Sequence, residues 1–408
     1  MNSSLNSSLN SSLVANVSAR AAVLEKLPER AQAAAAVAAK HAAAVDVAAR
    51  FPAEAFEAIK AQRLLGLLVP EALGGEGVGI ADVADVCYRL GQSCGASGMI
   101  YAMHQVKVAC IVRHLGESEA LARLLRQLCN EQLLLASSTT EGQGGGNVRS
   151  SEAAVEHQGA GISLERRASV ISYGAYADGI VTTARRSSEA ASSDQVLIAF
   201  LKSDYTLSRI SEWQTLGMRG TCSEGYLLKA SGTPDQILPV PYEAIHQRTM
   251  VPFAHLLWGS VWAGIAAAAV GRAQAFIRTA LRQSNGQMPP GAPHYTKALA
   301  SLRTLRSMLA SSLSTYERNM DDPSALGSLD FQSLITLTKV QASELAVATV
   351  SSALRVCGLS GYRCDGDFSV ERYLRDVLSS PLMINNERIL ANLATQSLLA
   401  PIPVSVRD

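Results

Sequence analysis

The pattern of apolar and polar positions divides the chain into three parts. Residues 18–135 carry apolar positions at helical spacing in an Ala-rich background, with a break at Phe51-Pro52. Residues 136–247 change to short apolar runs between Ser, Thr and Gly, which is typical of short strands. Residues 248–408 return to helical spacing. We therefore predict an α+β protein, mostly α, with a helical domain, a small β domain and a second helical domain.

The middle part predicts a small sandwich or barrel. No crossover helices separate its apolar runs, so a parallel Rossmann sheet is not expected. The glycine-rich stretch 142–147 lacks the strand-then-helix context of a dinucleotide-binding motif. The predicted strands are 169–173, 180–183, 196–201, 205–210 and 225–230.

The last part predicts a four-helix bundle. Leu302, Leu305 and Leu309 fall on one helical face, as expected of a helix that packs against others. The candidate helices are 253–283, 293–320, 329–356 and 384–399.

Two segments could be mistaken for targeting signals. Residues 1–17 include an Asn-Ser-Ser-Leu unit three times, without the basic and apolar regions of a signal peptide, and we expect a disordered leader. The apolar window 251–271 could just span a bilayer, but it contains Pro252 and His255. We interpret it as a buried helix and predict no membrane span.

Composition narrows the classes of partner. Hydrophobic residues make up 48% and charged residues 17%, with a formal net charge of +1. This balance indicates a globular protein and does not favour nucleic acid or an anionic membrane. The seven cysteines are scattered without a CxxC pair, which fits a reducing cytoplasm better than a disulfide framework or a zinc site.

Six short motifs occur in the order typical of one family. Arg372 with Arg375-Asp376, for example, matches an R-x-x-R-D pattern, and we expect Arg375 and Asp376 to form an internal ion pair. Over roughly residues 20–400 the chain resembles the acyl-CoA dehydrogenases. The resemblance implies bound FAD, an acyl-CoA or acyl-carrier-protein substrate, and a homotetramer or homodimer with FAD at subunit contacts. The motifs lie at 69–77, 140–141, 171–178, 216–223, 358–362 and 372–376.

The resemblance also suggests cofactor-binding residues. It implies that the Thr140 and Ser172 hydroxyls lie beside the flavin ring, where hydrogen bonds tune its electronics. Arg282 resembles an arginine that reaches the cofactor phosphates of a neighbouring subunit. Arg355 replaces a glutamine of the family and could hold a phosphate, or it could be a solvated charge on a helix. The remaining candidates are Gly146, Gly358, Gly361 and Asn386, of which Gly358 and Gly361 could instead cap a helix.

The family's catalytic carboxylate is missing. A base must remove the weakly acidic α proton of an acyl thioester, and in most of the family a Glu follows the Arg-Asp pair by eight residues. That position is Ile384 here. Glu387, shifted along a helix, or His104, in the segment that lines the acyl pocket in the family, could act instead, with Ser172 beside the flavin.

Three functions remain open from the sequence. The first is oxidation of an acyl thioester by a relocated base, in a specialised pathway. The second is oxygenation with O₂, because the chain also resembles flavin monooxygenases of the same fold, which lack the Glu. The third is flavin binding without catalysis. An electron-transfer flavoprotein or a flavin reductase is a candidate partner, since the chain contains no nicotinamide-binding motif.

Overall fold

The N-terminal part of the protein is helical, as predicted. The computed structural model describes residues 2–141, 149–398, 402 and 404–405. Ser118 caps the last of the N-terminal helices, because its hydroxyl oxygen accepts a hydrogen bond from the Leu121 amide at 3.2 Å. The helices are α1 (Asn2–Ala48), α2 (Ala53–Ala61), α3 (Ile80–Ser93), α4 (Gly95–His114) and α5 (Glu119–Glu131).

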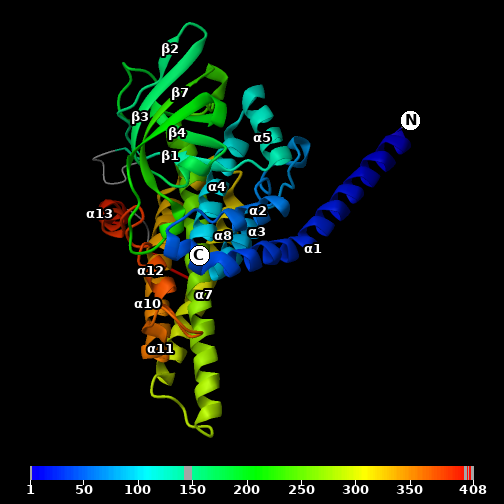
Figure 1. Ribbon diagram of the computed structural model, residues 1–408. Helices are drawn as coiled ribbons and strands as arrows, with labels where there is room; N and C mark the ends of the chain where they lie inside the picture. The colour runs from blue at the N-terminus through cyan, green and yellow to red at the C-terminus, as the bar shows by residue number, and fades with distance from the viewer. Residues whose placement is uncertain (1, 142–148, 399–401, 403, 406–408) are drawn as a thin grey trace.

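The first helix differs from the predicted disordered leader. Helix α1 begins at Asn2, so residues 2–17 are its first turns, and Figure 1 shows its N-terminal part projecting away from the rest of the protein. Serine and asparagine are weak helix formers, which is why a disordered leader was expected. However, no Gly or Pro occurs before Pro28, so nothing in this segment breaks the helix.

The β domain consists of two small sheets. One has the strand order β1-β4-β5 and the other β2-β3-β7-β6. Each of the five predicted strands overlaps an observed strand, whereas β1 and β2 were not predicted. The pair β1 and β4 is parallel and the other pairs are antiparallel. The strands are β1 (Leu135–Ser138), β2 (Glu156–Gln158), β3 (Gly161–Ile171), β4 (Gly179–Arg185), β5 (Gln195–Leu201), β6 (Tyr205–Ser211) and β7 (Glu224–Gly232).

The C-terminal part contains three long helices that pack on one another. Helix α7 lies against both α8 and α10, and also against α3 and α4 of the first domain. Figure 1 shows α7 and α10 extending away from the β domain. The helices are α6 (Tyr242–Ile245), α7 (Val251–Gln283), α8 (Ala292–Asn319), α9 (Pro323–Gly327), α10 (Leu329–Cys357), α11 (Leu359–Tyr362), α12 (Glu371–Val377) and α13 (Asn386–Ser397).

Helix α7 is the core helix of the molecule. Within the residues that the structure describes, the continuous helical stretch Tyr242–Gln283 is the one helix long and apolar enough to cross a bilayer. Of its most apolar window, 89% is buried inside the protein. The apolar side chains are therefore explained by packing against α3, α4, α8 and α10.

Candidate functional site

A cavity of about 650 Å³ lies where the β domain meets the helices. This volume is in the range of small-molecule sites. Its walls come from α4, the ends of β1 and β3, the loop between β6 and β7, the start of α7, and the segment that follows Arg375. No Asp or Glu is among the lining residues in the described part of the chain.

Helix α4 runs along one wall of the cavity. Met99, Met103, Val106 and Lys107 form a stripe at helical spacing that faces the cavity. The eight helical steps from Met99 to Lys107 rise by roughly 12 Å. A Cβ on Gly95, at the start of the helix, would lie 2.8 Å from Asp376 Oδ2, so this end of α4 meets α12.

Three hydroxyl groups form a chain on the cavity wall, here called the hydroxyl end. Thr221 donates to the Met218 carbonyl at 2.8 Å, and its oxygen lies 2.7 Å from the Ser223 oxygen. Ser223 in turn donates to the Ser172 oxygen at 2.8 Å. Because Ser172 accepts this bond, its own proton is available to a group in the cavity.

The loop that carries these hydroxyls is fixed to α12. The buried Asp376 carboxylate accepts a hydrogen bond from the Met218 amide at 2.7 Å, and burial raises the pKa of Asp376 to about 6. The predicted ion pair between Arg375 and Asp376 is wrong: Arg375 pairs with Asp46 of α1 and Glu371 of α12. Arg375 therefore fixes α12 to α1, and Asp376 fixes α12 to the loop that contains Met218.

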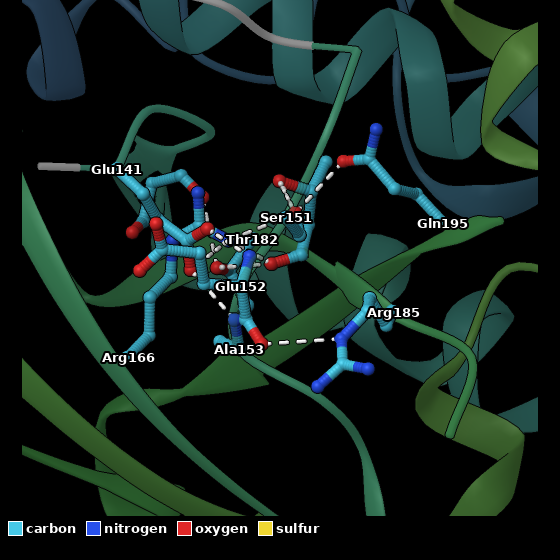
Figure 2. Close-up of polar contacts among 10 residues, drawn as sticks. Glu141, Ser151, Glu152, Ala153, Arg166, Thr182, Arg185 and Gln195 are labelled. Atoms are coloured by element: carbon cyan, nitrogen blue, oxygen red, sulfur yellow. Dashed lines mark hydrogen bonds and ion pairs between the residues drawn. The ribbon is translucent and has the colours of Figure 1, made fainter. Parts of the chain in front are cut away.

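Thr140 reaches the cavity from a segment anchored inside the β domain. The neighbouring Glu141 accepts hydrogen bonds from the Glu152 and Ala153 amides and lies 3.3 Å from the buried Arg166 guanidinium (Figure 2). These contacts hold the chain where β1 ends, so they position the Thr140 hydroxyl. Gly146, the other candidate from this motif, lies outside the described residues.

The opposite end of the α4 stripe is basic. Lys107 and His246, here called the basic end, both line the cavity and both are buried. Burial lowers the pKa of Lys107 to about 8 and the pKa of His246 to about 4. His246 belongs to η6 (His246–Met250), a π-helical turn of the kind that often occurs at functional sites.

His255, on the first turns of α7, has a fixed tautomer. Its Nδ1 lies 3.2 Å from the Ile335 carbonyl oxygen, which only accepts, so Nδ1 carries the proton. Burial lowers the pKa of His255 to about 3, which keeps the ring neutral. Its Nε2 therefore holds a lone pair on a residue that lines the cavity.

His104 has a different position from the one the sequence suggested. It is fully buried on the side of α4 away from the cavity lining. Its Nε2 donates to the Leu65 carbonyl at 2.9 Å, and its Nδ1 accepts from the Leu135 amide at 3.0 Å. One ring nitrogen thus joins α4 to β1 and the other joins α4 to the segment after α2, which leaves neither for acid–base chemistry.

The segment after α12 separates Ile384 from Glu387. Ile384 lines the cavity, but Ile384 and Asn385 both have positive φ angles, of 59° and 57°, so the chain turns here. Helix α13 begins only at Asn386, and Glu387 is exposed and is not a lining residue. The helical shift that would bring Glu387 round to the place of Ile384 is therefore absent.

Asn386 is occupied by protein contacts. Its side chain is buried and accepts from Lys339 Nζ at 2.7 Å, while its amide nitrogen donates to Ser343 and to Glu344, each at 2.9 Å. These bonds fix α13 to α10. These protein contacts account for the hydrogen-bonding groups of the Asn386 side chain, so a cofactor contact is not needed to explain its burial.

The other cofactor candidates lie at the ends of the long helices, apart from the cavity lining. Arg282 is exposed at the end of α7, and Arg355 is exposed at the end of α10. Gly358 has a φ of 55° and open space where a Cβ would project, whereas Gly361 packs tightly against Cys357. Within one chain the structure does not bring these residues to Ser172 and Thr140.

Sequence reasoning missed Lys107, His246 and His255. Lys107 carries the one charge that the sequence places between Met99 and Val112, an otherwise largely apolar stretch of α4. An isolated charge in such a stretch is a signal, because buried charges need a partner. The signal for His246 and His255 in the sequence was weaker. Both line the cavity, but the π-helical turn between them changes the helical spacing that would have related their positions.

The cavity residues fit a flavin. Its ring needs hydrogen bonds at its nitrogen and oxygen atoms, and the Ser172 proton and the Thr140 hydroxyl are available on lining residues. Val170, Trp213 and Met218 supply apolar walls. In the described part of the chain no cluster of three or more His, Cys, Asp or Glu side chains is placed to hold a metal ion.

Known proteins resemble this chain in sequence or in fold. The chain is 26% identical over 366 residues to cyclohex-1-ene-1-carbonyl-CoA dehydrogenase of Geobacter metallireducens, covering 88% of this chain and 92% of that protein. It is 25% identical over 367 residues to 3-sulfinopropanoyl-CoA desulfinase of Paraburkholderia xenovorans, covering 88% and 92%. FMN-bound TdsC of Paenibacillus sp. A11-2 has the same fold, with a TM-score of 0.81 at 17% identity over 93% of this chain and 98% of that one.

The family profiles match on both sides of the β domain. The acyl-CoA dehydrogenase N-terminal domain matches residues 26–132, and the acyl-CoA dehydrogenase C-terminal domain matches residues 250–398. Together with the fold and the cavity, these matches show that the chain belongs to the acyl-CoA dehydrogenase family and is a flavin-dependent oxidoreductase.

Proposed function

We propose that this protein uses FAD to oxidise an acyl thioester that is bound to CoA or to a carrier protein. The observation that carries the proposal is the cavity itself, which brings the Ser172 and Thr140 hydroxyls together with an apolar wall on α4. The two relatives named above are both named for CoA thioesters. A specialised pathway in the cytoplasm fits a chain that lacks the family's usual base.

FAD would supply the two-electron acceptor of the reaction. Ser172 and Thr140 would hold its ring, since both hydroxyls line the cavity. Arg282, Arg355 and Gly358 are exposed on this chain, and we propose that they contact the dinucleotide bound by a second copy, in a homodimer or homotetramer.

We propose His255 as the base in place of the missing carboxylate. Its Nε2 carries the lone pair because Nδ1 donates to the Ile335 carbonyl. Burial lowers the pKa of His255 to about 3, close to that of an ordinary carboxylate. The α proton of the substrate would pass to Nε2, and the Ile335 carbonyl would hold the ring in position through the transfer.

The test is to mix the purified flavoprotein with a panel of acyl-CoAs under anaerobic conditions. Reduction of the flavin is measured as the loss of its visible absorbance. We expect the wild type to bleach and the His255→Gln variant to bleach at least 100-fold more slowly while it still binds the thioester. A wild type that stays oxidised with every thioester would rule out the dehydrogenase function. A His255→Gln variant that bleaches at the wild-type rate would rule out His255 as the base.

One observation favours a second function, oxygenation. Ile384 replaces the carboxylate, and no other carboxylate lines the cavity in the described part of the chain. The monooxygenase TdsC shares the fold. Transfer of ¹⁸O from ¹⁸O₂ to the product would support oxygenation, with a flavin reductase as electron source. Full turnover without O₂, with an electron-transfer flavoprotein or an artificial acceptor, would support oxidation.

A further inference from the structure

Lys107 is a buried cation that has no counterion among the described residues. Only 3% of its surface is exposed, and its one hydrogen bond to a described residue is to the Met250 sulfur, at 3.7 Å. A thioether is a weak acceptor, and an uncompensated buried ammonium destabilises a folded protein. The ammonium form still predominates at pH 7, because burial lowers its pKa only to about 8.

The side chains around Lys107 that the structure describes supply no anion. Cys110 lies nearby on α4, and burial raises the pKa of its thiol to about 12, so it stays neutral. Tyr242 uses its hydroxyl to donate to the Met250 sulfur at 3.3 Å, and burial keeps it neutral as well. His246 adds a second nitrogen base and no negative charge.

A second feature points to a ligand at the same place. The π-helical turn η6 inserts one extra residue per turn and presents both His246 and Met250 to the cavity. The turn and Lys107 belong to different elements that meet at the end of the α4 stripe. The neighbouring lining side chains, Met103, Val106 and Val251, are apolar, so an anion that enters this part of the cavity would find its partners in Lys107 and His246.

We propose that the basic end binds a carboxylate at the far end of the acyl group, so that the substrate is a thioester of a dicarboxylic acid. This inference rests on the proposed function, in which the acyl thioester is oxidised beside the flavin that Ser172 would hold. The stripe on α4 rises by roughly 12 Å from Met99 to Lys107, which puts Lys107 at one end of this cavity wall. Lys107 would donate to the carboxylate, and His246 would donate a second hydrogen bond from its ring N–H.

The experiment measures binding, so that it does not depend on turnover. Wild-type flavoprotein is titrated with adipyl-CoA, pimelyl-CoA and their uncharged methyl-ester counterparts, and binding is followed by calorimetry and by the change in the flavin spectrum. We expect the diacid thioesters to bind on the order of 10- to 100-fold more tightly than the esters. In Lys107→Met this preference should disappear, and in Lys107→Arg part of it should remain.

Two controls separate a binding role from a structural one. Met103→Leu changes the cavity wall one turn before Lys107 without changing charge, and it should keep the preference for the diacid. Lys107→Met should be as stable to heat as the wild type, or more stable, since it removes an unpaired buried charge.

The outcomes distinguish this inference from the proposed function. Equal binding of the diacid thioesters and their esters by the wild type, or a preference that survives Lys107→Met, would overturn the carboxylate site alone. If none of the thioesters binds, both the carboxylate site and the proposed function fail together.

Discussion

The two ends of the cavity are built from different elements, and they also differ in how their polar groups are paired. At the hydroxyl end, Thr221, Ser223 and Ser172 are joined to one another by hydrogen bonds. At the basic end, Lys107 has only the Met250 sulfur as a hydrogen-bond acceptor among the described residues. The protein thus satisfies most of the hydroxyl end by itself and leaves the basic end dependent on a ligand.

The contrast shows how buried polar groups can be sorted into structural and ligand-binding ones. His104 is as buried as Lys107 and lies on the same helix, but both of its ring nitrogens are bonded to backbone groups. A polar group that the protein itself satisfies holds elements together. A polar group that the protein leaves unsatisfied, on a cavity wall, is a candidate for binding.

The largest expected effect is at Gly217, in the loop that carries the hydroxyl end. A Cβ there would lie 2.0 Å from the Arg375 carbonyl oxygen, so Gly217→Ala must push the loop away from α12. We expect a loss of about 3 kcal/mol in unfolding free energy and release of the flavin. Thermal melts and the flavin content after gel filtration measure both.

Gly271 provides the matched control. It lies inside α7 with nothing within 4 Å of an added Cβ. Gly271→Ala should stabilise the helix by about 0.5–1 kcal/mol without changing flavin content. Equal behaviour of the two variants would mean that the close approach of Gly217 to Arg375 does not hold the loop.

The second effect concerns His104 and pH. Burial lowers its pKa from 6.5 to about 4, so the folded state binds fewer protons than the unfolded chain between these values. This contribution to stability is complete above pH 6.5 and is lost as the pH falls toward 4, by roughly 3 kcal/mol at most. His114, His246 and His255 shift in the same direction, while Asp376, with its pKa raised to about 6, opposes them.

Denaturant unfolding at pH 7 and pH 5 tests this prediction. His104→Ala should be less stable by about 2–3 kcal/mol at pH 7, because the Leu135 amide loses its acceptor. It should also lose less stability than the wild type on going to pH 5. Flavin reduction per folded molecule should stay within twofold of wild type; a loss of 100-fold would return His104 to the catalytic candidates.

The third effect is smaller and tests the hydroxyl chain. Ser223→Ala removes the donor to Ser172, so the Ser172 hydroxyl loses the bond that orients it. We expect flavin affinity to fall about 5- to 10-fold, with little change in melting temperature. Fluorescence titration of the apoprotein measures the affinity. Ser223→Thr keeps the hydroxyl and should restore most of it; a Thr variant as weak as the Ala variant would contradict the role of the chain.

The sequence predicted the order of the domains because long helical segments flank a middle part with short apolar runs between Ser, Thr and Gly, and in α8 the leucines fall on one helical face. Ser172 and Thr140, which the family motifs suggested as flavin contacts, both line the cavity, and their contact with a flavin stays a prediction. The sequence could not predict the partners of Arg375, since Asp46 is 329 residues away in the chain. Nor could it distinguish His104 from Lys107, because their roles depend on which side of α4 faces β1.

The smallest expected effect is at Glu387, and it tests whether the cavity needs a carboxylate at all. Glu387 is exposed on the first turn of α13. The chain turns at Ile384 and Asn385, which have positive φ angles, so Glu387 does not reach the cavity that Ile384 lines. Glu387→Gln should therefore reduce flavin with acyl-CoA at a rate within twofold of wild type, measured anaerobically by stopped flow. Ile384→Glu is the informative companion, since it returns a carboxylate to the cavity wall. If the Gln variant is inactive, α13 must move when substrate binds; if it is unaffected and Ile384→Glu rescues His255→Gln, the proton acceptor in this chain is a neutral nitrogen base.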